Sequence, residues 1–180
     1  MWHYAVIVGY DLDRGKVVLV SGHREHEEFR LGFFEFLWQD SDYWAMVALP
    51  PGRLPATAGE VDYAAAVAAL ERIGRLPESR DSYRALTGRW PTSLPGLFGL
   101  GNVEYALGDL GAAERSFRLA VEAHPKSAPA MNNLAHTLAA LGRLAEAEGA
   151  ARNAVELGGP TEPEARKTLE EILAKRTSRP

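Results

Sequence analysis

The sequence contains no cysteine, which excludes disulfide bonds, thiolate metal sites and a cysteine nucleophile within these 180 residues. It has no apolar run of the roughly 20 residues that a membrane-spanning helix needs. Basic residues are not in excess, because 20 lysines and arginines stand against 24 aspartates and glutamates, and this balance argues against a nucleic-acid-binding face. The N-terminal residues carry no secretory signal, so a cytoplasmic location is the default expectation.

Aromatic residues are concentrated near the N-terminus, where 10 of the 16 lie within the first 44 residues. Residues 4–10 and 16–21 are runs of β-branched and aromatic residues joined by an Asp/Gly turn, which predicts a β-hairpin. A further strand is expected at 43–49. Between them, residues 31–39 are either a short helix or an irregular aromatic cap, because the spacing of their apolar residues does not decide.

Proline and glycine dominate residues 50–55, a composition that breaks helices and strands. After this segment the sequence becomes rich in alanine, which has the highest helix propensity. We therefore expect one domain at 1–49, a linker at 50–59 and a helical domain from residue 60.

The second half of the chain repeats every 34 residues, as the glycines Gly74, Gly108 and Gly142 show. A fixed period of this length predicts an architecture of stacked helix pairs. Each of these glycines can end the first helix of a pair in a left-handed conformation. The small residue Gly101 lets two helices approach closely, and Phe117 fills the layer below.

This pattern resembles the tetratricopeptide repeat. The resemblance implies an all-α superhelix of about three helix pairs, at 60–93, 94–127 and 128–161, sealed by a capping helix at 162–176. The most complete copy carries the matching residues Leu100, Gly101, Tyr105, Gly108, Ala113, Phe117, Ala120 and Pro125.

The same resemblance implies a concave groove, lined by the first helix of each pair, that binds a protein or peptide. Asn102 and Asn133 match asparagines that hold a peptide's terminal carboxylate in some members, but Phe98 stands where a basic lysine would serve. Alternatively, Asn133 bonds only within the helix layer. The residues expected on the lining are Phe98, Asn102, Tyr105, Asn132, Asn133 and His136.

The N-terminal hairpin resembles the C-terminal lobe of papain-like cysteine peptidases of the double-glycine, bacteriocin-processing type. In one bacterial branch this peptidase precedes tetratricopeptide repeats. The resemblance implies that His3 is the general base and that Ser21 stands at the place of the Asp or Asn that orients it. Asp11 or Asp13 are alternatives for the orienting group. The nucleophile would lie in an upstream lobe, so this chain alone is not expected to be a cysteine peptidase.

Two histidines, His23 and His26, stand beside carboxylates and would align as metal ligands on a helix. We expect a strand or loop there, in which residues three apart point to opposite faces. Neither a metal nor a cofactor is therefore expected.

The sequence thus predicts an α+β chain, with an antiparallel half-lobe of papain-like type followed by an all-α superhelix. One function consistent with this is an interaction scaffold with an inactive peptidase remnant. The other is the C-terminal portion of an active cysteine peptidase, whose cysteine lies upstream or comes from another chain. The expected partners are a protein or peptide in the groove, the missing peptidase half, and a second copy of the chain, which an uncovered apolar patch would favour.

Overall fold

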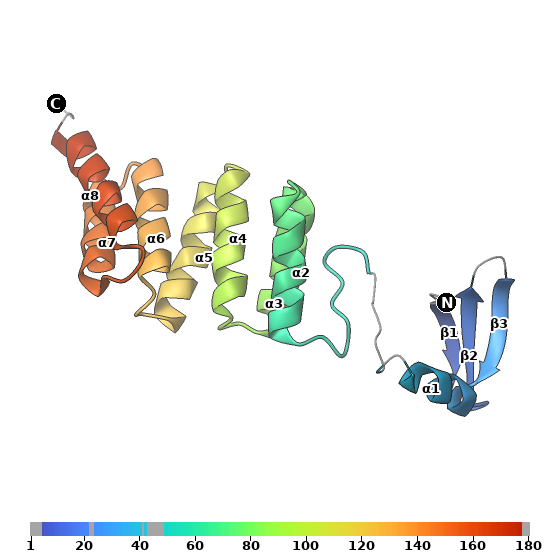
Figure 1. Cartoon of the computed structure of the whole chain (residues 1–180). Helices are drawn as coiled ribbons and strands as arrows, with labels where there is room; N and C mark the ends of the chain where they lie inside the picture. The colour runs from blue at the N-terminus through green and yellow to red at the C-terminus, as the bar shows by residue number, and fades with distance from the viewer. Residues whose placement is uncertain (1–4, 22–23, 41, 43–48, 178–180) are drawn as a thin grey trace. The chain divides into compact units, whose positions relative to one another are not determined.

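The structure is a computed structural model that describes residues 5–21, 24–40, 42 and 49–177. It divides into two compact units, residues 1–48 and residues 49–180. Strands and one helix make up the described part of the first unit, and helices make up the second (Figure 1).

The first unit is an antiparallel sheet in which β1 (Val6–Asp11), β2 (Lys16–Ser21) and β3 (Arg24–Arg30) follow one another in order. The predicted hairpin is confirmed, with Gly15 supplying the positive φ of 59° that its turn requires. Residues 31–39, for which the sequence allowed either a short helix or an irregular aromatic cap, form the helix α1 (Leu31–Gln39). Residues 43–48 of the strand expected at 43–49 lie outside the described residues.

Burial in this unit is confined to the central strand. Among its described residues only Val17 and Leu19 are buried, both on β2, and α1 contributes no buried side chain. Phe29 of β3 stacks on Phe33 of α1 with ring centroids 6.3 Å apart, which holds the helix to the sheet. The apolar side chains of β1 remain largely exposed.

The second unit is the predicted succession of helix pairs (Figure 1). None of the described helices is both long and apolar enough to cross a membrane. The helices are α2 (Glu60–Arg72), α3 (Leu76–Arg89), α4 (Leu94–Ala106), α5 (Leu110–Ala123), α6 (Ala128–Ala140), α7 (Leu144–Leu157) and α8 (Glu162–Thr177).

The repeating glycines end the first helix of each pair by one mechanism. Gly74, Gly108 and Gly142 have φ values of 78°, 81° and 78°, in the left-handed region that favours glycine. The Gly108 N–H bonds the Tyr105 carbonyl at 2.9 Å, and the next N–H bonds the Glu104 carbonyl at 2.9 Å. These two bonds satisfy carbonyls that the helix end would leave unpaired.

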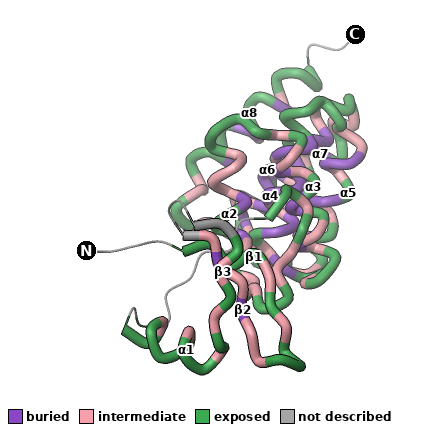
Figure 2. The backbone as a smooth tube through the Cα atoms, turned by 90° about the vertical axis from the view of Figure 1, so that its right-hand side faces the viewer, coloured by how far each residue is buried: buried purple, intermediate pink, exposed green. Residues whose placement is uncertain are grey.

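The core of this unit lies between successive helices, as the buried segments of Figure 2 show. Phe117 is 1% exposed, and a Cβ on Gly101 would come within 2.7 Å of its ring. In the next repeat the equivalent residues are Ala135 and Ala151, both fully buried. At the same two places one repeat has a glycine and a phenylalanine and the next has two alanines, and both combinations fill the layer.

The segment predicted as a linker, 50–59, is hydrogen-bonded to α3. The Gly52 N–H donates to the Ser82 hydroxyl at 3.0 Å, and Arg89 donates to the Pro55 and Ala56 carbonyls at 3.2 and 3.0 Å. These bonds order the backbone of residues 52–56 on the first helix pair.

Candidate functional site

The first helices of the pairs form one layer of the array. α4 contacts both α2 and α6, and α6 contacts α8, whereas no comparable backbone contact joins α5 to α7 among the described residues. Long side chains span that wider gap, with Arg118 reaching Glu146 at 3.0 Å and Arg143 reaching Glu114 at 2.6 Å. The array therefore curves toward α2, α4, α6 and α8, and we call the side formed by these helices the inner face.

Two of the predicted lining residues bond to each other across the inner face. Asn133 Nδ2 on α6 donates to Asn102 Oδ1 on α4 at 2.8 Å. Both side chains are half-buried. The structure thus brings together the two asparagines that the sequence analysis singled out, in a bond between neighbouring repeats.

A second polar contact joins α6 to α8. Thr168 Oγ1 lies 2.8 Å from His136 Nε2 and donates its proton to the Glu164 carbonyl at 2.9 Å. Because a hydroxyl has one proton, the bond to His136 is donated by the imidazole Nε2–H. His136 is exposed, so its Nδ1 is left to solvent or to a ligand.

The remaining predicted lining residues differ in their exposure. Tyr105 is 41% exposed near the end of α4. Phe98 is half-buried and meets Phe117 edge-on with ring centroids 6.0 Å apart, so much of its ring belongs to the core. Asn132 is 9% exposed, and its Oδ1 is buried without a hydrogen-bond partner.

The repeat pattern assigned from the sequence needs one correction, because the buried position near the end of α4 is held by Glu104 rather than by Tyr105. Glu104 is 3% exposed, and it accepts hydrogen bonds from Ser116 at 2.7 Å and from Arg84 at 3.3 Å. The 34-residue register pairs Glu104 with the buried Leu138, so Tyr105 is free to reach the surface.

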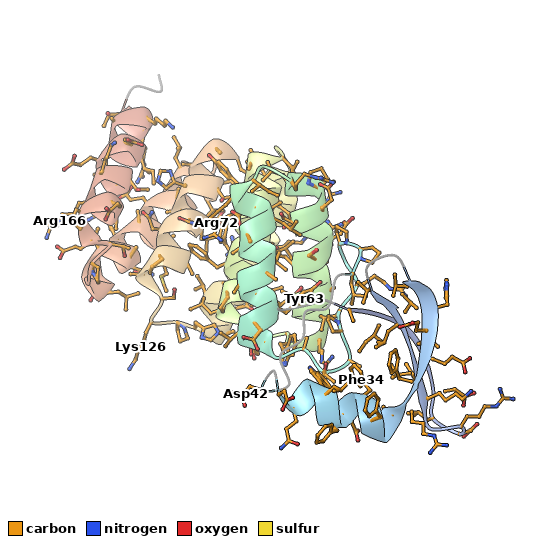
Figure 3. All side chains as sticks on the ribbon, turned by 45° about the vertical axis from the view of Figure 1, so that its right-hand side comes forward. Phe34, Asp42, Tyr63, Arg72, Lys126 and Arg166 are labelled. Atoms are coloured by element: carbon orange, nitrogen blue, oxygen red, sulfur yellow. The ribbon has the colours of Figure 1, made fainter. Side chains whose placement is uncertain are left out.

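One basic residue at the edge of the inner face was missed by sequence reasoning. Lys167 on α8 follows Asn133 by 34 residues and is exposed. Extending the repeat register into the capping helix would have found it. The neighbouring Arg166 projects from α8 at the end of the array, where it pairs with Glu162 at 2.6 Å (Figure 3).

Two shallow hollows lie elsewhere on the helical unit, and the six predicted lining residues border neither. One, of about 350 Å³, lies at the start of α7 beside Arg176, and the other lies between α6 and α7.

The predicted peptidase residues fall largely outside what the structure describes. His3 and His23 lie outside the described residues, and Ser21 ends β2 without a described side chain. Asp11 accepts a bond from the Arg14 N–H at 2.9 Å in the turn, at the opposite end of the hairpin from Ser21. Among the described residues, no cluster of three or more His, Asp or Glu side chains could hold a metal ion.

Comparisons with known proteins identify the helical unit. Residues 98–163 match the family model described as tetratricopeptide repeat. The first repeat domain of Spaghetti (RPAP3), solved bound to the HSP90 peptide SRMEEVD, is 21% identical; the match covers 66% of this chain and 94% of that chain with a TM-score of 0.62.

Two further solved structures show the same fold. The Yersinia enterocolitica chaperone SycD, in complex with a peptide of the translocator YopD, is 22% identical, with 68% and 99% of the two chains covered and a TM-score of 0.61. PcrH, in complex with the chaperone-binding region of PopD, is 19% identical, with 69% and 99% covered and a TM-score of 0.63. No curated protein matches the chain. These findings give no support to the papain-like resemblance of residues 1–49, which stays a prediction.

Proposed function

Because this chain contains a tetratricopeptide repeat domain, we propose that it is a protein-interaction scaffold that binds an extended segment of a partner on its inner face. The observation that carries the proposal is the surface of α4 and α6. There Tyr105 is exposed beside the bonded pair of Asn102 and Asn133, so an aromatic surface adjoins hydrogen-bonding amides.

Two features of this surface suit peptide binding. Tyr105 offers a rigid aromatic surface that costs little conformational entropy on binding, and Asn102 lies one turn before it on the same helix. Three related folds, those of RPAP3, SycD and PcrH, were solved with peptides or binding regions of their partners. Their likeness to this chain in fold makes peptide binding by the helical array the best-supported function.

The test is a selection of binding segments from two phage-displayed random libraries, one with free C-termini and one with segments held at both ends. The bait is the full chain, and binders are then measured by calorimetry against two variants. Tyr105→Lys should weaken binding at least tenfold by removing the aromatic surface. Leu119→Lys, at a 52% exposed apolar position on α5, is the matched control and should bind as the wild type does. Failure of both libraries, or unchanged binding by Tyr105→Lys, would refute the proposal.

A second candidate function is the C-terminal portion of a cysteine peptidase, with His3 as general base. One observation favours it: Val6 lies opposite Val20, so the start of β1, which follows His3 in the sequence, adjoins the end of β2 at Ser21. In the papain-like resemblance, the general base and the group that orients it both lie at this end of the hairpin. No thiol exists in the chain, so the nucleophile must come from outside it.

The requirement for an outside nucleophile is tested by assaying the purified chain with a fluorogenic peptide ending in Gly-Gly. We expect no turnover by the chain alone. Turnover that His3→Ala abolishes would show that the chain carries a working catalytic group and would contradict our expectation of inactivity.

A further inference from the structure

The asparagine pair on the inner face has hydrogen-bonding groups to spare. Asn133 Nδ2 donates one N–H to Asn102 Oδ1, so the Asn102 amide N–H groups and the Asn133 side-chain carbonyl oxygen remain available for hydrogen bonds. Neither makes a further hydrogen bond to any described residue, and neither is among the buried unpartnered atoms, so both reach solvent. A donor on α4 therefore stands beside an acceptor on α6.

This arrangement does not depend on which way the two amides are turned. If both side chains were rotated, Asn102 would donate and Asn133 would accept, and the free groups would be an acceptor on α4 and a donor on α6. In either case one donor and one acceptor remain side by side. That couple complements the N–H and C=O of one residue in an extended chain, which point to the same side, whereas the N–H and C=O of a single trans peptide group point in opposite directions.

The side chains around the pair argue against a carboxylate in this position. On α4 the pair is flanked by Phe98 and Tyr105, and on α6 by Asn132 and His136, none of which carries a fixed charge. Neither α4 nor α6 carries a lysine or arginine, so a carboxylate drawn from water onto these two helices would have no cation on them to compensate its lost hydration. Neutral backbone N–H and C=O groups meet their hydrogen-bonding needs there at much lower cost.

The charged residues near the inner face lie toward its two ends. Glu71 on α2 already accepts the Tyr83 hydroxyl at 2.9 Å, and Lys167 belongs to α8, one repeat beyond Asn133. Glu104 on α4 is buried, and it is engaged by Ser116. The middle of the face, where the pair lies, is therefore its uncharged part.

We infer that the Asn102–Asn133 pair binds the N–H and C=O of one residue of an extended partner segment, so that the inner face recognises an internal, extended, uncharged segment rather than a C-terminal carboxylate. The inference rests on the proposed function and names its ligand chemistry. Tyr105, three residues after Asn102, packs against the apolar side chain of a residue next to the bound one. Recognition through the main chain tolerates varied side chains, and binding through neutral groups depends little on salt.

The test uses the tightest-binding segment from the selection described above, synthesised in two forms, one with a free C-terminal acid and one acetylated and amidated. Calorimetry should give equal affinities for the two forms. Asn102→Ala and Asn133→Ala should each lower the affinity about tenfold, and the double variant should lose little more, because each single change already breaks the couple. Asn153→Ala, at an exposed asparagine on α7, is the matched control.

A second measurement locates the residue of the segment whose main chain is bound by the pair. Methylating the backbone nitrogens of the amidated segment one at a time should abolish binding to the wild type at one position, and that position should matter much less in Asn133→Ala. Circular dichroism of each variant confirms that it is folded.

The outcomes separate this inference from the proposed function. Binding that requires a free carboxylate, or that survives both asparagine substitutions, overturns the inference and leaves the scaffold function standing. If the affinity of the segment is also unchanged by Tyr105→Lys, both the inference and the proposed function are overturned.

Discussion

Gly101 and Gly149 both lie inside helices, but their surroundings differ. A Cβ on Gly101 would come within 2.7 Å of the Phe117 ring, whereas a Cβ on Gly149 would meet nothing within 4 Å. Helix propensity favours alanine over glycine by about 1 kcal/mol at either place. At Gly101 the steric cost of overpacking, about 1–3 kcal/mol, opposes and exceeds that gain.

We therefore expect Gly149→Ala to raise the free energy of unfolding by about 0.5–1 kcal/mol and Gly101→Ala to lower it. Urea denaturation of the two variants measures both. Combining Gly101→Ala with Phe117→Ala copies the alanine pair Ala135 and Ala151 of the next repeat, so its cost should be less than the sum of the single costs. Effects of the same sign for the two glycines would contradict this account.

Residue-scale detail also accounts for the one error in the repeat pattern. Tyr105 and Glu104 are adjacent, and an aromatic residue is the ordinary choice for a buried place. The sequence could not show that Ser116 and Arg84 would meet the Glu104 carboxylate, since those residues lie on other helices. With that partner set the carboxylate can be buried, and the tyrosine turns outward.

At the scale of elements, an Arg–Glu network joins α5 to α7 across the outer side of the array. The Arg118 guanidinium, together with that of Arg143, holds the pKa of the Glu114 carboxyl below its usual range. Hydrogen bonds led by Arg143 lower the pKa of Glu146 in the same way. A carboxyl whose pKa is lower in the folded state stabilises the fold above its unfolded pKa, and this stabilisation is lost as the pH falls through the folded pKa.

Acidification should accordingly weaken the link between α5 and α7. We expect the Tm of the wild type to fall from about pH 5 downward, and Glu114→Gln to lower the Tm at pH 7 by about 2–4 °C while flattening that acid decline. Thermal unfolding followed by circular dichroism between pH 7 and pH 3 measures this. Glu122→Gln, on an exposed part of α5, is the control and should follow the wild-type curve. An unchanged pH profile for Glu114→Gln would rule out this role.

At the scale of the whole molecule, the two units differ in how completely they bury their apolar residues. In the first unit Val6, Ile7 and Tyr10 of the edge strand β1 are 60%, 47% and 72% exposed. A unit this small, with no cysteine for a disulfide, has little core to stabilise it. The other edge, β3, carries five charged residues in seven, which discourages pairing with another strand.

We therefore expect the full chain to self-associate reversibly through β1 at micromolar concentrations, and residues 49–180 to remain monomeric. The fragment begins at 49 so that it keeps the bonds of Gly52 and Pro55 to α3. Sedimentation velocity over a concentration series checks both. Ile7→Lys should abolish association, whereas Ile73→Lys, at an isoleucine that is even more exposed on the helical unit, should leave it intact. A full chain that is monomeric at every concentration would disprove this.

The period, the helix pairs and the turns follow from the sequence, because these depend on local chemistry. Gly108 adopts the left-handed conformation that ends the helix before it, and glycines at 34-residue intervals end the first helices of the other pairs in the same way. The resemblance to the tetratricopeptide repeat also indicated that Asn102 and Asn133 lie on or near the lining of one groove.

What those residues do depends on how the helices pack. The bond between Asn102 and Asn133 joins residues 31 positions apart, and the burial of Glu104 depends on partners on two other helices. Such contacts follow from the distance and rotation between packed helices, which no single segment encodes. The hydrogen-bonding groups left free on the inner face, on which the proposed recognition of a partner's main chain rests, are therefore a property of the assembled array.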